Sequence, residues 1–178
     1  MTEPMQQTSS GLHRWTLLLS IVLPLLLLAL LGQDRNWDLQ NYHYYNPFAW
    51  LHGRLSLDIA PAQMQTWHNP LLDVPLYLVT RAGWPGFVAS LWLTLPMMLA
   101  LYFLLRMYRL LGRNPTRIGL SALGVIALTG AAACAEIGTC FNDAFVAAGM
   151  LGGLFVLMRE SAGGERASNW FLAGVLAG

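Results

Sequence analysis

The stretch WTLLLSIVLPLLLLALLG, residues 15–32, decides the fold class, because no charged side chain interrupts it. A helix needs about 20 mostly apolar residues to cross the hydrocarbon core of a bilayer with its backbone groups satisfied. The stretch therefore predicts a spanning helix, in which Pro24 is tolerated. A cleaved signal peptide is the alternative, since Arg14 precedes the apolar run. The run is long for such a peptide, however, and residues 32–34 form a poor cleavage site.

The composition of the whole chain favours the same class. Apolar residues make up 56% of the sequence and charged residues 11%, whereas a water-soluble domain carries about a quarter charged residues. The net charge of +1 provides no basic field for a nucleic-acid partner, so we expect none. Cys134 and Cys140 are too few for a disulfide scaffold or a metal site. The expected surroundings are a lipid bilayer.

Further apolar runs predict an all-α, polytopic bundle of transmembrane helices. Residues 1–12 are polar and are expected to form a disordered cytoplasmic tail, followed by a transmembrane domain over residues 13–178. A fifth run begins at residue 170 and is unfinished at residue 178, so we expect the chain to be the N-terminal part of a longer protein. The expected spans are residues 15–32, 85–105, 118–135, 144–158 and the unfinished run from 170.

The arginines predict the orientation, because basic residues gather on the cytoplasmic side of a membrane. The short connection between the second and third spans carries four of them, which places it and the N-terminus in the cytoplasm. The long loop of residues 33–84 and the turn of residues 136–143 then lie on the extracytoplasmic face. The cytoplasmic arginines are Arg14, Arg106, Arg109, Arg113, Arg117, Arg159 and Arg166, against Arg35, Arg54 and Arg81 outside.

The long loop begins with a segment, residues 33–45, in which carboxylates, amides and tyrosines alternate. Aromatic residues near a membrane often only anchor the headgroup region, but this role leaves the interleaved carboxylates unexplained. Read as a helix, the segment places Asp38 and Tyr42 on one face, with Tyr45 a turn further on. Such a face suits a polyhydroxylated or phosphate-bearing ligand. A short interfacial helix over residues 46–51, capped at Gly53, is expected next.

The stretch WDLQNYHYYNPFAWLHGRL, residues 37–55, followed by NPLLDVP, residues 69–75, resembles uncharacterised bacterial members of the GT-C superfamily. These are multi-spanning glycosyltransferases that use polyprenyl-phosphate-linked sugars. The resemblance covers most of residues 15–158, and its motif is loose: an Asp after the first helix with a Tyr four residues later. It implies a bacterial inner-membrane enzyme acting on an envelope acceptor at the outer face.

The resemblance also suggests site residues. The catalytic or metal-binding carboxylate of the first loop maps onto Asp38, with Asp34 as the fallback. The acidic motif of the second outer turn maps onto Glu136 and Asp143. Many members have a tight acidic pair there, whereas six residues separate the two here.

Glycosyl transfer needs a base for the acceptor hydroxyl and stabilisation of the departing phosphate. Asp38 is the expected base, with Tyr42 beside it. The phosphate requires cations or donors, or a divalent metal such as Mg or Mn held by carboxylate oxygens. The remaining candidates for substrate binding are His43, Arg54, His68, Arg81, Glu136 and Asp143.

Two other functions fit the sequence. The first is a transporter or flippase subunit, although no ionisable residue lies in the middle of a predicted span, where ion coupling usually needs one. The second is a non-catalytic membrane scaffold, which leaves the composition of the loop unexplained.

Overall fold

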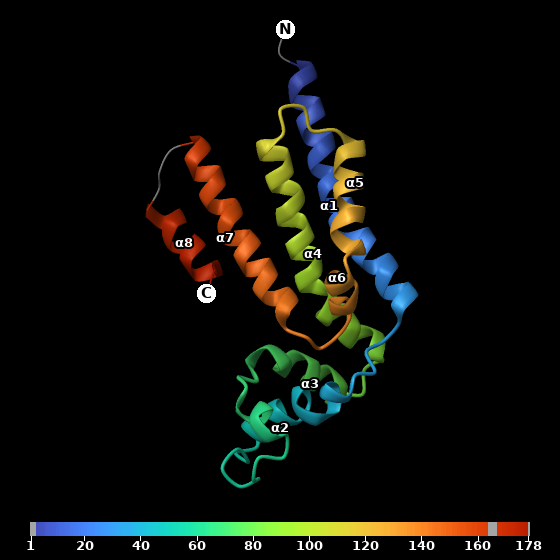
Figure 1. The fold of residues 1–178 in the computed structure, drawn as a ribbon, viewed down its shortest axis with the longest axis vertical. Coiled ribbons are helices and arrows are strands. Elements are labelled where there is room, and N and C mark those ends of the chain that lie inside the picture. Colours follow the sequence, from blue (N-terminus) through green and yellow to red (C-terminus); the bar gives the residue numbers. More distant parts are fainter. Residues whose placement is uncertain (1–2, 164–166, 178) are drawn as a thin grey trace.

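A computed structural model describes residues 3–163 and 167–177 (Figure 1). Every regular element in this part of the chain is a helix, which confirms the all-α class. The two longest helices are α1 (Glu3–Leu31) and α4 (Gly86–Leu111). Within the described residues, Ser10–Leu31 and Gly86–Leu111 are the two segments long and apolar enough to cross a membrane.

The expected polar tail is helical from Glu3 onward, because α1 continues without a break into the apolar run. Residues 1–2 and Arg166 lie outside the described part of the chain. Pro24 and Pro96 both lie inside helices, as was predicted for Pro24. The helices therefore extend further than the apolar runs that revealed them.

The segment expected as a third span, residues 118–135, is two helices in the structure. α5 (Arg117–Thr129) ends at Gly130, whose backbone is extended, and the short α6 (Ala131–Glu136) follows. The side chain of Thr116 caps the start of α5 by accepting from the backbone N–H of Gly119 at 3.0 Å. Thr116 thus fixes the start of α5, and Gly130 its end.

The fourth apolar run lies inside α7 (Asp143–Gly163), and the fifth forms α8 (Ala167–Ala177). The glycines of α7 allow close helix packing, as the sequence suggested. A Cβ on Gly149 would collide with the backbone carbonyl of Leu176 in α8, and a Cβ on Gly152 would lie 3.0 Å from the Phe103 ring in α4. α7 therefore contacts helices on two sides.

Helices α1, α4, α5 and α7 form a bundle, with α8 against the outer side of α7 (Figure 1). Trp15 in α1 donates from Nε1 to Ser121 Oγ in α5 at 3.2 Å. The bundle core consists mainly of aliphatic side chains. Its most completely buried members include Leu28, Leu101, Leu105, Leu120 and Leu128.

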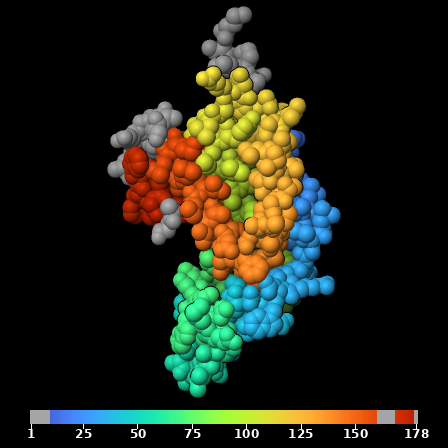
Figure 2. All heavy atoms as spheres, viewed as in Figure 1, coloured from blue at the N-terminus to red at the C-terminus, as the bar shows by residue number. Residues whose placement is uncertain are grey.

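Residues 33–84 form a lobe at one end of the bundle, which Figure 2 shows as a protrusion. The lobe is built from short helices, and its main pair is α2 (Tyr45–Leu51) and α3 (Val74–Arg81). The chain leaves α2 through Gly53 at φ +64°, which confirms the predicted end of the interfacial helix. The other elements are the π-helical turn η1 (Leu39–His43) and the 3-10 turns η2 (Gln63–Trp67) and η3 (Leu71–Asp73).

Candidate functional site

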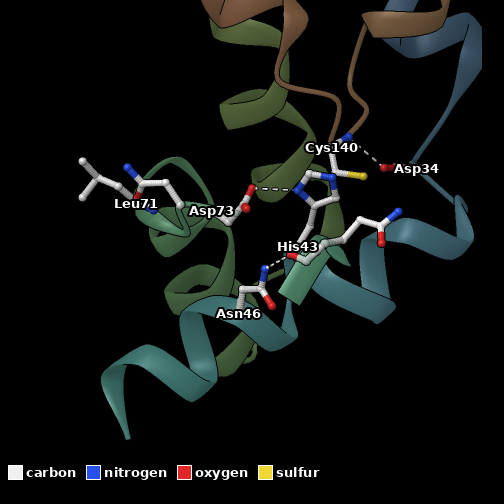
Figure 3. Close-up of polar contacts among 8 residues, drawn as sticks. Asp34, His43, Asn46, Leu71, Asp73 and Cys140 are labelled. Carbon is white, nitrogen blue, oxygen red and sulfur yellow. Dashed lines mark hydrogen bonds and ion pairs between the residues drawn. The ribbon is translucent and has the colours of Figure 1, made fainter. Parts of the chain in front are cut away.

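Asp34 joins the lobe to the turn of residues 136–143. One of its carboxylate oxygens accepts from the backbone N–H of Cys140 at 2.9 Å, and the other accepts from Asn36 at 2.7 Å (Figure 3). Ile137 and Cys140 are both buried at this contact. The two segments expected on the outer face thus meet in space, although about a hundred residues separate Asp34 from Cys140.

Asp38 and Tyr42 are paired, as their spacing predicted. Asp38 precedes η1 and Tyr42 lies within it, one turn later. Burial raises the pKa of Tyr42 above its usual value, and the adjacent Asp38 carboxylate raises this pKa further through its charge and a hydrogen bond. The Tyr42 phenol therefore stays protonated, and the neighbouring Asp38 carboxylate is a suitable acceptor for it.

Beside this pair lies a buried histidine supported by a carboxylate. His43 Nδ1 lies 3.0 Å from Asp73 Oδ1, and each residue is only 4% exposed (Figure 3). A carboxylate accepts hydrogen bonds, so Nδ1 of His43 carries a proton and donates it to Asp73. Among the described residues, Nε2 is buried and has no hydrogen-bond partner. We call His43 and Asp73 the dyad.

Aromatic and polar side chains enclose the dyad. The Tyr42 ring lies 4.2 Å from the His43 ring, centre to centre, and contacts His68 edge-on at 5.7 Å. Asn46 is buried beside the dyad and donates to the carbonyl of Gln65 at 2.8 Å (Figure 3). This hydrogen bond joins α2 to η2. Tyr42 thus links Asp38 to the dyad and to His68.

Cys140 also belongs to this cluster. Burial, and then the nearby Asp34 carboxylate, raise the pKa of its thiol far above the usual range. The thiol therefore stays protonated, and the fully buried Cys140 acts as a small packing residue.

Arg54 does not join Asp38. It pairs with Asp58 through contacts of 2.7 and 2.9 Å, and the Tyr45 hydroxyl donates to the same carboxylate. The hydrogen bonds from Arg54 and Tyr45 lower the pKa of Asp58. Asp58 thereby holds both Arg54 and Tyr45 in place.

Arg81 lies between α2 and α3. Its Nη1 is 3.3 Å from the Tyr77 hydroxyl and 3.4 Å from His52 Nε2, and its guanidinium lies 5.9 Å from the centre of the Tyr77 ring. Both hydrogen-bonding partners are uncharged side chains, so the positive charge of Arg81 is available to a ligand.

Glu136 and Asp143 approach each other across the turn. Glu136 accepts from the backbone N–H of Ala144 at 3.3 Å. Burial raises the pKa of Glu136, and the charge of Asp143 raises it further. Both carboxylates line a mostly apolar cavity of about 290 Å³ between α4, α5 and α7.

The described residues contain no cluster of three or more His, Cys, Asp or Glu side chains arranged to hold a metal ion. Asp38, Glu136 and Asp143 therefore do not form a metal site made only of this protein's own ligands, and we assign no step to a metal.

The sequence alone did not indicate the partner of His43 or the aromatic contacts of Arg81. Asp73 stands directly before α3, where a carboxylate often caps a helix, but its side chain makes no capping hydrogen bond. Tyr44, Phe48 and His52 are spaced four apart, as are Tyr77 and Arg81, so a search for helical faces could have found them.

No protein-family model matches the chain, and no match was found among curated proteins or solved structures. What the chain does is therefore inferred from the geometry of its site.

Proposed function

We propose that this chain belongs to a membrane-embedded glycosyltransferase of the GT-C type. It transfers a sugar from a polyprenyl-phosphate donor to an envelope acceptor at the extracytoplasmic face of a bacterial inner membrane. The observation that carries the proposal is the Asp38–Tyr42 pair beside the buried His43–Asp73 dyad. A positioned carboxylate next to a polar, aromatic cluster is what deprotonation of an acceptor hydroxyl requires.

The exposed surface of the bundle supports membrane insertion. Many large apolar side chains on its helices face outward, which is unfavourable in water and suits contact with lipid. We propose α5 and α7 as further spans beside α1 and α4, in a multi-pass bundle with a cytoplasmic N-terminus. Examples of the exposed side chains are Leu18, Leu30, Ile126, Val146 and Phe171.

In the proposed reaction, the oxygen of the acceptor hydroxyl attacks the anomeric carbon as the bond from that carbon to the phosphate oxygen breaks. The phosphate leaves with the bonding electrons, and the hydroxyl proton passes to the carboxylate of Asp38. The acceptor hydroxyl takes the place of the Tyr42 phenol as the donor to Asp38. His43 stacks on Tyr42 and holds that ring in position, because Asp73 fixes the imidazole.

The test is transfer of label from a polyprenyl-phosphate sugar in membranes containing the full-length protein. Asp38→Asn keeps the size of the side chain but removes the base, so transfer is expected to stop while membrane insertion is retained. Asp58→Asn is the matched control, since Asp58 belongs to the same lobe but pairs with Arg54. Transfer at the normal rate by the Asp38→Asn variant would remove Asp38 from the catalytic role.

One observation favours a transporter instead. The Glu136 and Asp143 carboxylates line an apolar cavity, and the raised pKa of Glu136 suits reversible proton binding. For a proton-coupled transporter, Glu136→Gln would abolish substrate-driven proton movement in proteoliposomes. The glycosyltransferase proposal expects no such movement in the unaltered protein.

A further inference from the structure

The lobe contains a second hollow, separate from the Asp38–Tyr42 pair, between α2 and α3. Its volume is about 430 Å³. From the α2 side, Tyr44, Phe48 and His52 line it as one helical face, and Tyr77 and Arg81 line it from α3. Two faces with four-residue spacing thus point toward each other and leave a space between them.

The hollow has an aromatic floor. Tyr77 is 2% exposed, and its ring lies 5.2 Å from that of Tyr44 and 6.4 Å from those of Phe48 and His52, centre to centre. Phe48 and His52 lie 4.6 Å apart. Such rings provide large, rigid surfaces that can contact the apolar face of a sugar ring, while their polar edges remain available for hydrogen bonds.

A positive charge lies at the edge of this floor. His52 Nδ1 donates to the carbonyl of Phe48 at 2.8 Å, so its Nε2 presents a lone pair to Arg81 at 3.4 Å. No carboxylate of the described residues forms an ion pair with Arg81, whereas Arg54 is paired with Asp58. Arg35 and Arg81 are thus the arginines of the lobe without an ion pair among the described residues, and Arg81 is the one that lines this hollow.

We propose that this hollow binds a glycosyl phosphate, with the phosphate on Arg81 and the sugar ring against Tyr44, which the buried Tyr77 supports from below. A guanidinium forms short, charge-assisted hydrogen bonds with phosphate oxygens. Gln40 also lines the hollow and lies two residues after Asp38 in the sequence. The assignment of the ligand as the sugar donor rests on the proposed function.

The experiment measures binding of glucose 1-phosphate to the purified full chain by isothermal titration calorimetry. Arg81→Gln removes the free charge and is expected to weaken binding about tenfold or more, the scale of a lost charge-assisted hydrogen bond. Arg54→Gln is the matched control and is expected to stay within about twofold of the parent. Tyr44→Leu is expected to weaken binding of glucose 1-phosphate but not of inorganic phosphate.

Two ligands offer a phosphate to Arg81: a glycosyl phosphate and an anionic lipid headgroup. Nanodiscs of phosphatidylcholine, with or without phosphatidylglycerol, distinguish between them. The proposal expects binding of glucose 1-phosphate in both, lost in the Arg81→Gln variant. Binding that is unchanged by Arg81→Gln, or weakened equally by Arg54→Gln, would overturn it. An Arg81 effect seen only on association with phosphatidylglycerol would also overturn it, because the arginine would then be reading lipid headgroups.

The same variants distinguish a failure of the hollow from a failure of the proposed function. If glucose 1-phosphate binds in a way that depends on Arg81 but the protein has no transfer activity, the binding site is supported and the glycosyltransferase proposal is rejected. Transfer activity without binding of glucose 1-phosphate would support the glycosyltransferase proposal and reject the binding site.

Discussion

The His43–Asp73 dyad shows what a single buried pair contributes. Taking an imidazole and a carboxylate out of water is costly, and their hydrogen bond offsets that cost only while both partners are present. Thirty residues separate the two, and nothing in the local sequence of either one indicates the other. The sequence therefore singled out His43 but could not name its partner.

Removing the Asp73 carboxylate should show how much the stability of the fold depends on its hydrogen bond with His43. Asp73→Ala leaves the buried Nδ1–H of His43 without an acceptor, so the free energy of unfolding should fall by about 1–3 kcal/mol. The measurement is an unfolding titration with sodium dodecyl sulfate in mild detergent. Asp58→Ala is the control and should cause a much smaller loss, since its ion pair is exposed to solvent. Equal losses in the two variants would argue against a stabilising dyad.

The stability of the fold is expected to depend on pH through Glu136 and its neighbour Asp143. The raised pKa of Glu136 means that the folded state holds this proton more tightly than the unfolded state does. Its contribution to stability is therefore present below the ordinary value of 4.5 and is lost as the pH rises through the folded pKa. Asp143→Asn removes the like charge and should lower the pKa of Glu136.

The shift is measured from the carboxyl ¹³C resonances of glutamate-labelled protein, with Glu136→Gln to assign the signal. Burial is the larger cause of the raised pKa, so the expected shift is downward but incomplete. An unchanged titration would show that the two carboxylates do not interact across the turn.

At the scale of elements, the packing of α7 on α8 depends on one glycine. A Cβ at Gly149 would collide with the backbone carbonyl of Leu176, which cannot move without shifting α8. Gly149→Ala should therefore destabilise the fold by about 1–3 kcal/mol, the usual cost of overpacking. The same detergent titration measures it.

Gly174 in α8 is the matched control, because a Cβ there would meet no atom within 4 Å. Gly174→Ala should be neutral or should stabilise α8 by about 0.5–1 kcal/mol through helix propensity. If both variants behaved alike, the close approach of α7 and α8 would not contribute to stability.

The elements were predictable to different degrees, for physical reasons. Apolar runs locate α1 and α4 because hydropathy extends over many residues, and Gly53 marks the end of α2 because the chain turns there with positive φ. The break at Gly130 was missed, since an apolar sequence reads alike through a continuous helix and an interrupted one. The Asp38–Tyr42 pair was predicted because it is local, whereas the contacts of Asp34 and Asp73 are not.

At the scale of the whole molecule, the lobe differs from the bundle in what it encloses. The lobe holds the polar cluster and the aromatic hollow, and both parts expose large apolar side chains. The turn of residues 136–143 fastens one to the other through the Asp34 contact. A site of this kind works only if the lobe faces the compartment in which the sugar is transferred.

That requirement makes the orientation a decisive prediction. Ile59 is 97% exposed in the loop that follows α2, and Arg113 is exposed in the connection between α4 and α5, which lies at the end of the bundle away from the lobe (Figure 1). In a Cys134→Ser background, Ile59→Cys should react with a membrane-impermeant maleimide applied to intact spheroplasts, because the arginine distribution places the lobe outside. Arg113→Cys should react only after permeabilisation. Buried Cys140 is the internal control and should stay unlabelled in both cases. The reverse pattern would put Asp38 and Arg81 in the cytoplasm, where a donor presented at the outer face could not reach them.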